Sequence, residues 1–539
     1  MPNRRTFLTQ VGAATVAASV INLDVHAASG SNQRANDCAK LRRDAAMAGL
    51  QATPQNLQHP NNQDEDLYPN KIGNYSKGLP HNADGTVVLS AYNALVNALN
   101  SGRPADFDAI PLGGTTGLTN PQSGLAFDMQ GPDAHAPIQP PAPAFASRQQ
   151  AAEISENYWM ALLRDVPYSQ YSTNLIANAA AADLTLYGSD FKGAKTGGAV
   201  TTAALFRGLT AGDQAGPYLS QFFYQDCNFG ANKIEQKITT TVPGLNYMTD
   251  FDTWLAAQRG IAQGPDAFDP MPRYIRNGRD LGQWVHIDVL FQAYFQAFLV
   301  LAGAHAPFDD GNPYNNNPSQ IGFGTFGGPH IATLLCEVST RALKAVWYQK
   351  WFVHRRLRPE VMAARVHRTL FAGAGYPVNS EILNSFNDSN RLKGFMPAGN
   401  ALLPQAFPEG SPTHPAYGAG HATVAGACVT ILKAWFKETT RLVDIGLDPV
   451  QPADDGLSLV PYTGSDAGDL TVGGELNKIA ANVALGRNTA GVHWRSDGTE
   501  SMKLGEAIAI GILKDQRACY NEVFNGFTLT KFDGTTMTV

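Results

Sequence analysis

The sequence is poor in charge, in cysteine and in long hydrophobic runs. Only 16% of its 539 residues are charged, and the net charge at pH 7 is −6. Nucleic acids and anionic membranes are bound through a positive field, which this composition does not supply, so we expect neither as a partner. Beyond the N-terminus, we expect no segment to reach the ~18 apolar residues of a membrane-spanning helix.

The five cysteines are far apart and none forms a Cys-x-x-Cys pair, which argues against the common zinc sites and against a disulfide-dense scaffold. Segments with the alternation typical of strands are also scarce. One short hairpin is expected within FNGFTLTKF near the C-terminus. Because strand patterns are scarce, a mainly helical fold is the prediction.

The N-terminus has the order of elements found in a twin-arginine export signal. Arg4 and Arg5 precede an apolar run that ends in Val25-His26-Ala27, a small-residue cleavage site. A disordered basic tail is the alternative. We predict a signal peptide over residues 1–27 and export to the periplasm or the medium.

Helical patterns dominate after residue 146. Residues 28–146 are first polar and then rich in proline and glycine, which predicts an irregular N-terminal arm. From Ser147, expected as a helix N-cap, apolar residues recur at three- and four-residue spacing. The segment 279–304 is apolar almost all round, as expected of one buried helix. We predict an all-α fold with its helical domain over residues 147–539.

The first of three basic clusters is KWFVHRRLRPEV. Lys350, His354 and Arg358 recur every four residues and so follow one side of a helix. Pro359 disfavours helical geometry at the preceding residue, so we expect the helix to end at Arg358. A solvated basic face is the alternative, but the neighbouring tryptophans favour burial.

The second cluster, GAGHATVAGA, places His421 at the start of a predicted helix. Gly418 and Gly420 allow close approach of the backbone, and the first turn of a helix offers unpaired N–H groups and a positive dipole end. His421 could exchange protons with an anion bound there. A tight turn without function is the alternative.

The third cluster is LGRNTAGVHWRSDGTES. Arg487 and His493 face one side only if the helix breaks between them, which Gly491 allows. Asp497 is expected to cap the last helix, with Glu500 as its partner. His493 could instead be a core histidine. Taken together, the three clusters bring several cations to one point, and buried cations repel one another unless an oxyanion such as phosphate or vanadate lies among them.

The set Lys-x7-Arg-Pro, Gly-His and Arg-x5-His resembles the signature shared by vanadium-dependent haloperoxidases and PAP2-type acid phosphatases. FGTFGGPH, YQKWFVHRRLRPE, EGSPTHPAYGAGHA and GVHWRSDG are most similar to the bromoperoxidase type. Over residues 150–520 the resemblance implies two four-helix bundles forming one core, and assembly into homo-oligomers. It also implies an enzyme that oxidises bromide, or chloride, with hydrogen peroxide to hypohalous acid, which halogenates organic acceptors.

The resemblance also implies vanadate as the cofactor, with His493 as the vanadium ligand. Lys350, Arg358, Arg487 and Gly420 would bind the vanadate oxygens. His421 would be the acid–base residue, and Lys350 would also activate peroxide. Two alternatives stay open: a phosphatase in which His493 attacks phosphorus, and an oxyanion-binding protein without catalysis.

Two positions bear on variation within that family. Ala419 stands where many members have serine, so one hydrogen bond to the cofactor should be missing. His414 matches the second histidine of bromoperoxidases, whereas Trp347 resembles the aromatic residue of chloroperoxidases. As an alternative, His414 braces the turn between Pro412 and Pro415.

Two further features are weaker. His286 and Asp288 could support a site residue, although roles in the core are favoured. The loop 309–320 has enough oxygen ligands for calcium, but Asn-rich loops usually bind no metal.

Overall fold

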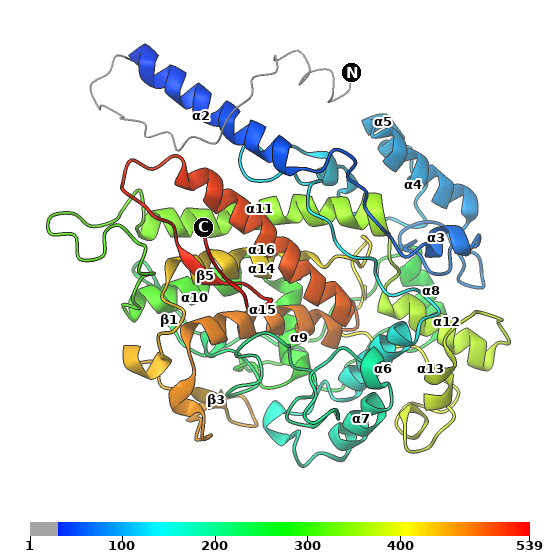
Figure 1. The fold of residues 1–539 in the computed structure, drawn as a ribbon. Coiled ribbons are helices and arrows are strands. Elements are labelled where there is room, and N and C mark those ends of the chain that lie inside the picture. The colour runs from blue at the N-terminus through cyan, green and yellow to red at the C-terminus, as the bar shows by residue number, and fades with distance from the viewer. Residues whose placement is uncertain (1–30) are drawn as a thin grey trace. The chain divides into compact units, whose positions relative to one another are not determined.

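A computed structural model describes residues 31–539 (Figure 1) and distinguishes two compact units, Met1–Met47 and Ala48–Val539. The described part of the first unit belongs to helix α2 (Ser31–Ala52). The signal peptide predicted over residues 1–27 lies outside the described residues.

The second unit is built mainly of helices, which confirms the predicted fold class. Its strands, within the described chain, form three antiparallel two-stranded ribbons. They are β1 (Cys227–Phe229) with β2 (Asn232–Ile234), β3 (Val450–Pro452) with β4 (Leu459–Pro461), and β5 (Thr528–Thr530) with β6 (Thr536–Thr538). The last ribbon is the expected C-terminal hairpin, although its second strand lies beyond the predicted segment. Short 3₁₀ turns connect the helices: η1 (Pro121–Leu125), η2 (Tyr168–Gln170), η3 (Gly188–Asp190), η4 (Gln221–Phe223), η6 (Leu392–Gly394), η7 (Leu442–Ile445) and η8 (Ala467–Asp469).

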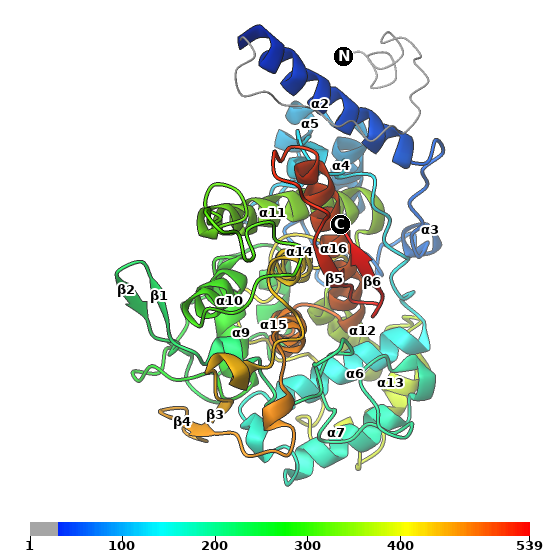
Figure 2. The same cartoon turned by 60° about the vertical axis from the view of Figure 1, so that its left-hand side comes forward.

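The larger group of helices surrounds α14 (Gly420–Trp435), which is buried along almost its whole length. Helices α11 (Gly328–Tyr348), α15 (Val472–Thr489) and α16 (Arg495–Arg517) pack around it, as Figure 2 shows. Gly426 and Gly505 allow the close packing of α14 against α16, because a Cβ at either position would meet backbone atoms of the other helix at 2.0 or 1.9 Å. Helices α9 (Gly278–Ile287) and α10 (Gln292–Gly303) complete this group.

A second group of helices encloses its own apolar core. It contains α6 (Arg148–Leu162), α7 (Leu175–Thr185), α12 (Pro359–Phe371) and α13 (Ser380–Ser385). The predicted cap is present, since the Ser147 hydroxyl accepts a hydrogen bond from the Gln150 N–H at 3.1 Å. The short helix α8 (Phe251–Gln258) packs through Trp254 in a smaller cluster.

The expectation of an irregular arm over residues 28–146 is wrong in part. Besides α2, the segment contains α3 (Asp64–Leu67), α4 (Leu89–Ser101) and α5 (Pro104–Asp108). Helix α4 buries Tyr92 and Leu95 in a cluster with Trp351. The prediction missed it because a single helix of this length shows few repeats of its apolar spacing between loops rich in glycine and proline.

The single helix expected over residues 279–304 is also wrong. The chain breaks between α9 and α10, whose axes differ by 100°. At the break Asp288 has an extended backbone (φ −64°, ψ 151°). Together these two helices have the length and apolarity of a membrane span, whereas no single helix in the described chain has both.

Candidate active site

The Lys350 side chain is fully buried in a short π-helical turn, η5 (Gln349–His354), that follows α11. Its Nζ donates to the carbonyl oxygens of Pro415 and Ala416 at 2.7 and 3.2 Å. Burial, followed by the repulsion of neighbouring cations, lowers the pKa of Lys350 well below its usual value. The Lys350 side chain is therefore held by neutral carbonyls, and the Asp497 carboxylate acts on it only from farther away.

The helix predicted to continue to Arg358 ends at His354, so that prediction is wrong. Arg355 adopts a left-handed backbone (φ 39°) and is held there by its bonds to Glu65 and the Trp351 carbonyl, both 2.8 Å. The His354 ring faces Tyr417 at 4.7 Å, and neither of its nitrogens has a hydrogen-bond partner among the described residues.

Arg358 is also fully buried and reaches the same site from the N-cap of α12. Its Nη1 donates to the Val492 carbonyl at 2.7 Å and lies 2.9 Å from His493 Nε2. Its Nη2 donates to the His414 carbonyl at 2.8 Å and lies 2.9 Å from His414 Nδ1. Arg358 thus joins the two histidines. Burial lowers its pKa to about 10, although the Asp497 carboxylate opposes this shift.

Arg487 extends from the last turn of α15, and Gly491 (φ 88°) ends the α-helical path before His493, as predicted. Its Nη1 donates to the Val285 carbonyl at 2.8 Å, while its buried Nε has no partner in the described structure. The guanidinium lies 5.5 Å from the Phe407 ring centroid. Burial lowers the pKa of Arg487 to about 10. Arg487 therefore keeps an unused N–H donor at the site.

Lys350, Arg358 and Arg487 are buried without a direct carboxylate partner, and we call these three residues the anion cage. Within residues 31–539, no carboxylate oxygen lies within 4.0 Å of any of their nitrogens. Several other buried cations are paired with a carboxylate, for example Lys77 with Glu360 at 2.7 Å, whereas Arg164 and Arg365 are buried singly and bond carbonyl or amide oxygens. Carboxylates act on the cage cations only from farther away, Asp497 on Lys350 and Arg358 and Asp288 on Arg487. Because a buried charge without a direct partner is costly, three such cations at one place favour a bound anion.

Gly420 is the first residue of α14, so its N–H belongs to the unpaired first turn of that helix. A Cβ at this position would lie 3.2 Å from the Trp347 ring. His421 follows it, and its Nε2 lies 2.9 Å from Asp288 Oδ1. The His421 side chain is 17% exposed and Asp288 is 3% exposed. Of the two roles considered for Asp288, the structure favours support of a site residue.

His493 belongs to a buried chain of charged groups. Its Nδ1 lies 2.8 Å from Asp497 Oδ2, and the other Asp497 oxygen accepts from Arg356 Nη1 at 2.8 Å. Arg356 also donates to Glu153 at 3.0 Å. Burial raises the pKa of Asp497, and Arg356 opposes that shift. The carboxylate holds the His493 proton on Nδ1, which leaves a lone pair on Nε2 facing Arg358.

Asp497 does not occupy the predicted N-cap position. Trp494 is the N-cap of α16, and Asp497 is the third residue of the helix, where its carboxylate accepts from the Trp494 N–H at 3.2 Å. The prediction placed the helix start too late because Asp497 satisfies the N-terminus from inside the first turn. This position is what lets one carboxylate serve both the helix and His493.

His414 is buried against the cage and also contributes to its own turn. Its ring lies 4.8 Å from that of Trp347, and its Nδ1 is 3.3 Å from the Pro415 carbonyl. Burial and the charges of Lys350 and Arg358 lower its pKa well below 6.5, so the ring is neutral at ordinary pH. Since Arg358 can only donate, Nδ1 accepts from it, and the turn is closed instead by the His414 N–H, which donates to the Pro412 carbonyl at 2.9 Å.

Ala419 is the N-cap of α14 and has no side-chain oxygen to offer. Its own N–H donates instead to the Ser501 hydroxyl at 2.8 Å. Sequence reasoning did not find Ser501, because a serine inside α16 carries no local sign of this contact. His286, the other residue considered for support, bonds Glu409 at 2.6 Å and stacks on Phe407, the ring beside Arg487.

The calcium site suggested in the loop 309–320 stays a prediction. Side-chain oxygens of Asp309, Asn312 and Asn317 accept N–H groups of the same loop. Among the described residues no group of three His, Cys, Asp or Glu side chains could hold a metal ion. Cys38, Cys227, Cys336 and Cys428 form no disulfide in the described structure.

Comparison with known proteins identifies the family. Residues 333–522 match the model of the VCPO second helical-bundle domain. A vanadium-dependent bromoperoxidase of Corallina pilulifera is 37% identical, with 90% of this chain and 94% of that protein covered. One of Ascophyllum nodosum is 35% identical, with 94% of both covered.

A solved structure agrees with these relatives. The homohexameric second vanadate-dependent bromoperoxidase of Ascophyllum nodosum superimposes with a TM-score of 0.87 at 31% identity, covering 99% of this chain and 95% of that one. Identity of this level over nearly the full length of both proteins shows common descent. The chain therefore belongs to the vanadium-dependent bromoperoxidase family.

Proposed function

We propose that this protein binds vanadate in the anion cage and uses it to oxidise bromide with hydrogen peroxide. The observation that carries the proposal is the set of three buried cations without a carboxylate partner around His493. The same residues test the fit of the cofactor. Arg487 Nε is a buried donor without a partner in the described residues. His493 Nε2 carries the lone pair that now faces Arg358 Nη1 at 2.9 Å and that a metal would take in its place.

In this proposal each residue has a separate task. Lys350, Arg358 and Arg487 would bind the vanadate oxygens, the Gly420 N–H would donate to one of them, and His493 Nε2 would ligate vanadium. When bound, vanadate supplies a Lewis-acidic centre that activates peroxide toward a halide without a change in the oxidation state of the metal.

His421 is the proposed proton carrier. The overall reaction, H₂O₂ + Br⁻ + H⁺ → HOBr + H₂O, consumes one proton in each turnover. Since Asp288 engages His421 Nε2, the nitrogen left for exchange is Nδ1. The Asp288 carboxylate orients the ring through Nε2, and partial exposure connects that ring to solvent. His414 and Trp347 lie against each other beside Lys350, where they would shape the halide approach.

The experiment is reconstitution of metal-stripped protein with orthovanadate. We expect peroxide-dependent bromination of a phenol dye to appear with vanadate, and chloride assayed in parallel to react more slowly. A phosphate ester tests the alternative in which His493 acts as nucleophile. Ready hydrolysis of the ester, with no bromination at any vanadate concentration, would overturn the proposal in favour of a phosphatase.

We further propose that hypobromous acid halogenates small organic acceptors, that the chain forms homo-oligomers and that it is exported through the twin-arginine route. The homohexamer of the Ascophyllum relative supports assembly, and Arg4 and Arg5 support export. Light scattering of the purified protein tests assembly. Substitution of both arginines by lysine, followed by fractionation of the expressing cells, tests export.

A further inference from the structure

The loop over residues 409–416 supplies the backbone groups that hold two of the cage cations. Its carbonyl oxygens at residues 414–416 accept from Lys350 or Arg358 at 2.7–3.2 Å. Hydrogen bonds weaken steeply when their distance or angle departs from the optimum. These carbonyls therefore hold the cations only while the loop stays in place.

One buried carboxylate fixes the start of this loop. Glu360, in the first turn of α12, accepts through Oε2 from both the N–H and the hydroxyl of Ser411, at 2.8 Å each. The Glu360 side chain is 0% exposed. Gly410 precedes Ser411 with φ 65°, and a Cβ at Gly410 would lie 2.7 Å from Glu360 Oε2. The loop thus approaches the carboxylate as closely as glycine allows.

The partner of Glu360 comes from the segment predicted to be an irregular arm. Lys77 is 2% exposed, and its Nζ donates to Glu360 Oε1 at 2.7 Å and to the Glu409 carbonyl at 2.5 Å. The same ammonium group thus meets the carboxylate and holds the residue on the other side of Gly410. Because a buried ion pair is often no more stabilising than apolar residues of the same volume, stability alone does not explain its presence.

The same arm also holds the middle of the loop. Thr413 Oγ1 donates to the Gly117 carbonyl at 2.6 Å, and the Thr413 carbonyl accepts from the Thr119 N–H at 2.9 Å. The loop is therefore fixed by α12 and by the arm up to the residue before His414.

We propose that Lys77 and Glu360 are positioning residues of the anion cage. They hold residues 409–411, and through the loop they set where the carbonyls of residues 414–416 meet the cations. Neither forms a hydrogen bond or ion pair with a cage residue in the described structure. This role rests on the proposed vanadate site, but the position of the loop can be measured without vanadate.

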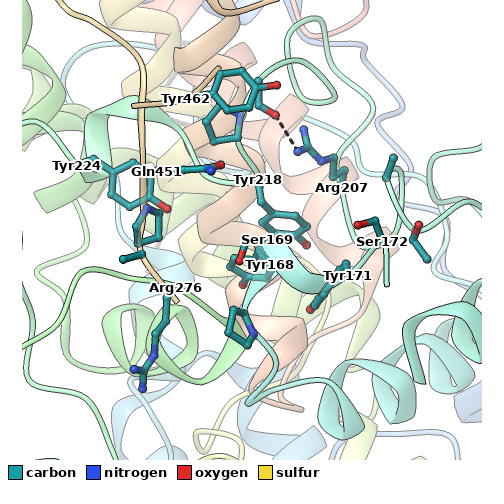
Figure 3. Close-up of a pocket in the computed structure, with 17 residues that line it drawn as sticks. Tyr168, Ser169, Tyr171, Ser172, Arg207, Tyr218, Tyr224, Arg276, Gln451 and Tyr462 are labelled. Carbon is teal, nitrogen blue, oxygen red and sulfur yellow. Dashed lines mark hydrogen bonds between the residues drawn. The ribbon is translucent and has the colours of Figure 1, made fainter. Parts of the chain in front are cut away.

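A second buried pair provides a matched control. Lys478 and Glu475 in α15 are 2.6 Å apart, and their side chains are almost fully buried. The pair lies beside the tyrosine-rich cavity shown in Figure 3, because Gly216 lines that cavity and a Cβ at Gly216 would lie 3.4 Å from Lys478 Nζ. No cage residue lines the cavity. Loss of this pair should therefore leave the cage unchanged.

The first experiment measures hydrogen–deuterium exchange of the loop in the vanadate-free protein. Lys77→Met and Lys478→Met each leave a buried carboxylate without its partner, so both should lower the urea midpoint of unfolding. Only Lys77→Met should speed exchange in peptides covering residues 409–416, by about tenfold. Ser411→Ala keeps the ion pair and removes one hydroxyl, so it should speed exchange in the same peptides by a smaller factor.

Two results of this experiment would overturn the proposal. One is exchange of residues 409–416 that is unchanged in both Lys77→Met and Ser411→Ala. The other is an equal acceleration of this loop in Lys478→Met, which would mean that the loop responds only to a general loss of stability.

The second experiment separates position from stability. Lys77→Met combined with Glu360→Met removes both charges, so part of the stability lost in Lys77→Met should return, whereas the bonds to the loop stay lost. Equilibrium dialysis is expected to show vanadate affinity about tenfold lower in both of these proteins and unchanged in Lys478→Met. Vanadate affinity that returns together with stability would contradict a positioning role. A wild type that binds no vanadate would instead refute the proposed function.

Discussion

Replacing Asp497 with asparagine would keep the shape of the buried His493–Asp497 pair and change its chemistry. The carboxylate accepts from His493 Nδ1 at 2.8 Å, and therefore fixes the tautomer in which Nε2 has the lone pair. An asparagine amide can present its NH₂ group to Nδ1 instead. The proton then moves to Nε2, which can no longer ligate a metal.

The size of the effect follows from the contacts that remain. Loss of a group that orients a metal-bound histidine lowers metal affinity about 10- to 100-fold, which corresponds to about 1.4–2.8 kcal/mol. Breaking a buried ion pair outright costs about 3–5 kcal/mol of stability. Arg356 keeps Glu153 at 3.0 Å, so we expect a smaller loss of about 1–3 kcal/mol here.

The assay is a titration of the vanadate-free protein with orthovanadate, with bound vanadate measured by equilibrium dialysis. Asp183→Asn is the control, since Asp183 is also buried and accepts from Trp159 and Arg391 but lies in the core of the second helix group. It should lower the unfolding free energy without changing vanadate affinity. A folded Asp497→Asn protein that binds vanadate as wild type does would refute the role assigned to this carboxylate.

Three further changes have distinct expected results. Asp288→Asn should lower kcat for bromination about 10- to 100-fold, because His421 loses the carboxylate that orients its ring, while vanadate affinity changes little; a large loss of vanadate affinity with unchanged kcat would contradict this. Ala419→Ser should tighten vanadate about tenfold through one added hydrogen bond, and equal or weaker affinity in dialysis would show that this position does not face the cofactor. Burial lowers the pKa of His81 to about 4 and that of His354 to about 3. The unfolded chain therefore takes up protons below pH 6.5 that the folded chain does not, so stability should be unaffected by these groups above that pH and fall below it, by about 1 kcal/mol for each histidine at about pH 5.5. Urea unfolding at about pH 5.5 and at a pH above 6.5 measures the loss of unfolding free energy. An equal loss in a variant lacking both histidines would show that His81 and His354 do not cause it.

The residues of the anion cage could be predicted because short sequence motifs indicate them. Few residues bind an oxyanion, and Lys350, Arg358 and Arg487 stand in short motifs with aromatic or glycine neighbours that signal burial. The structure brings these three together with His493, and His421 is connected to them through Asp288, which bonds His421 and acts on Arg487. Their roles toward vanadate remain predictions until the cofactor is bound.

The paths by which these residues reach the cage could not be predicted. Lys350 and Arg358 come from different elements because Arg355 leaves the helix through a bond to Glu65, which is 290 residues away in the sequence. Asp288 reaches His421 only because the chain breaks between α9 and α10. Both features depend on contacts between segments that are distant in the sequence. The spacing of residues within one segment cannot indicate such contacts.

The most direct measurement is a titration of the vanadate-free enzyme in which bound vanadate and bromination rate are followed together, in wild type and in His493→Ala. We predict one vanadate for each chain in wild type, with activity rising in proportion to occupancy, and no activity in His493→Ala at saturating vanadate. Full bromination without vanadate, or in the His493→Ala protein, would contradict the assignment of the anion cage as the catalytic centre.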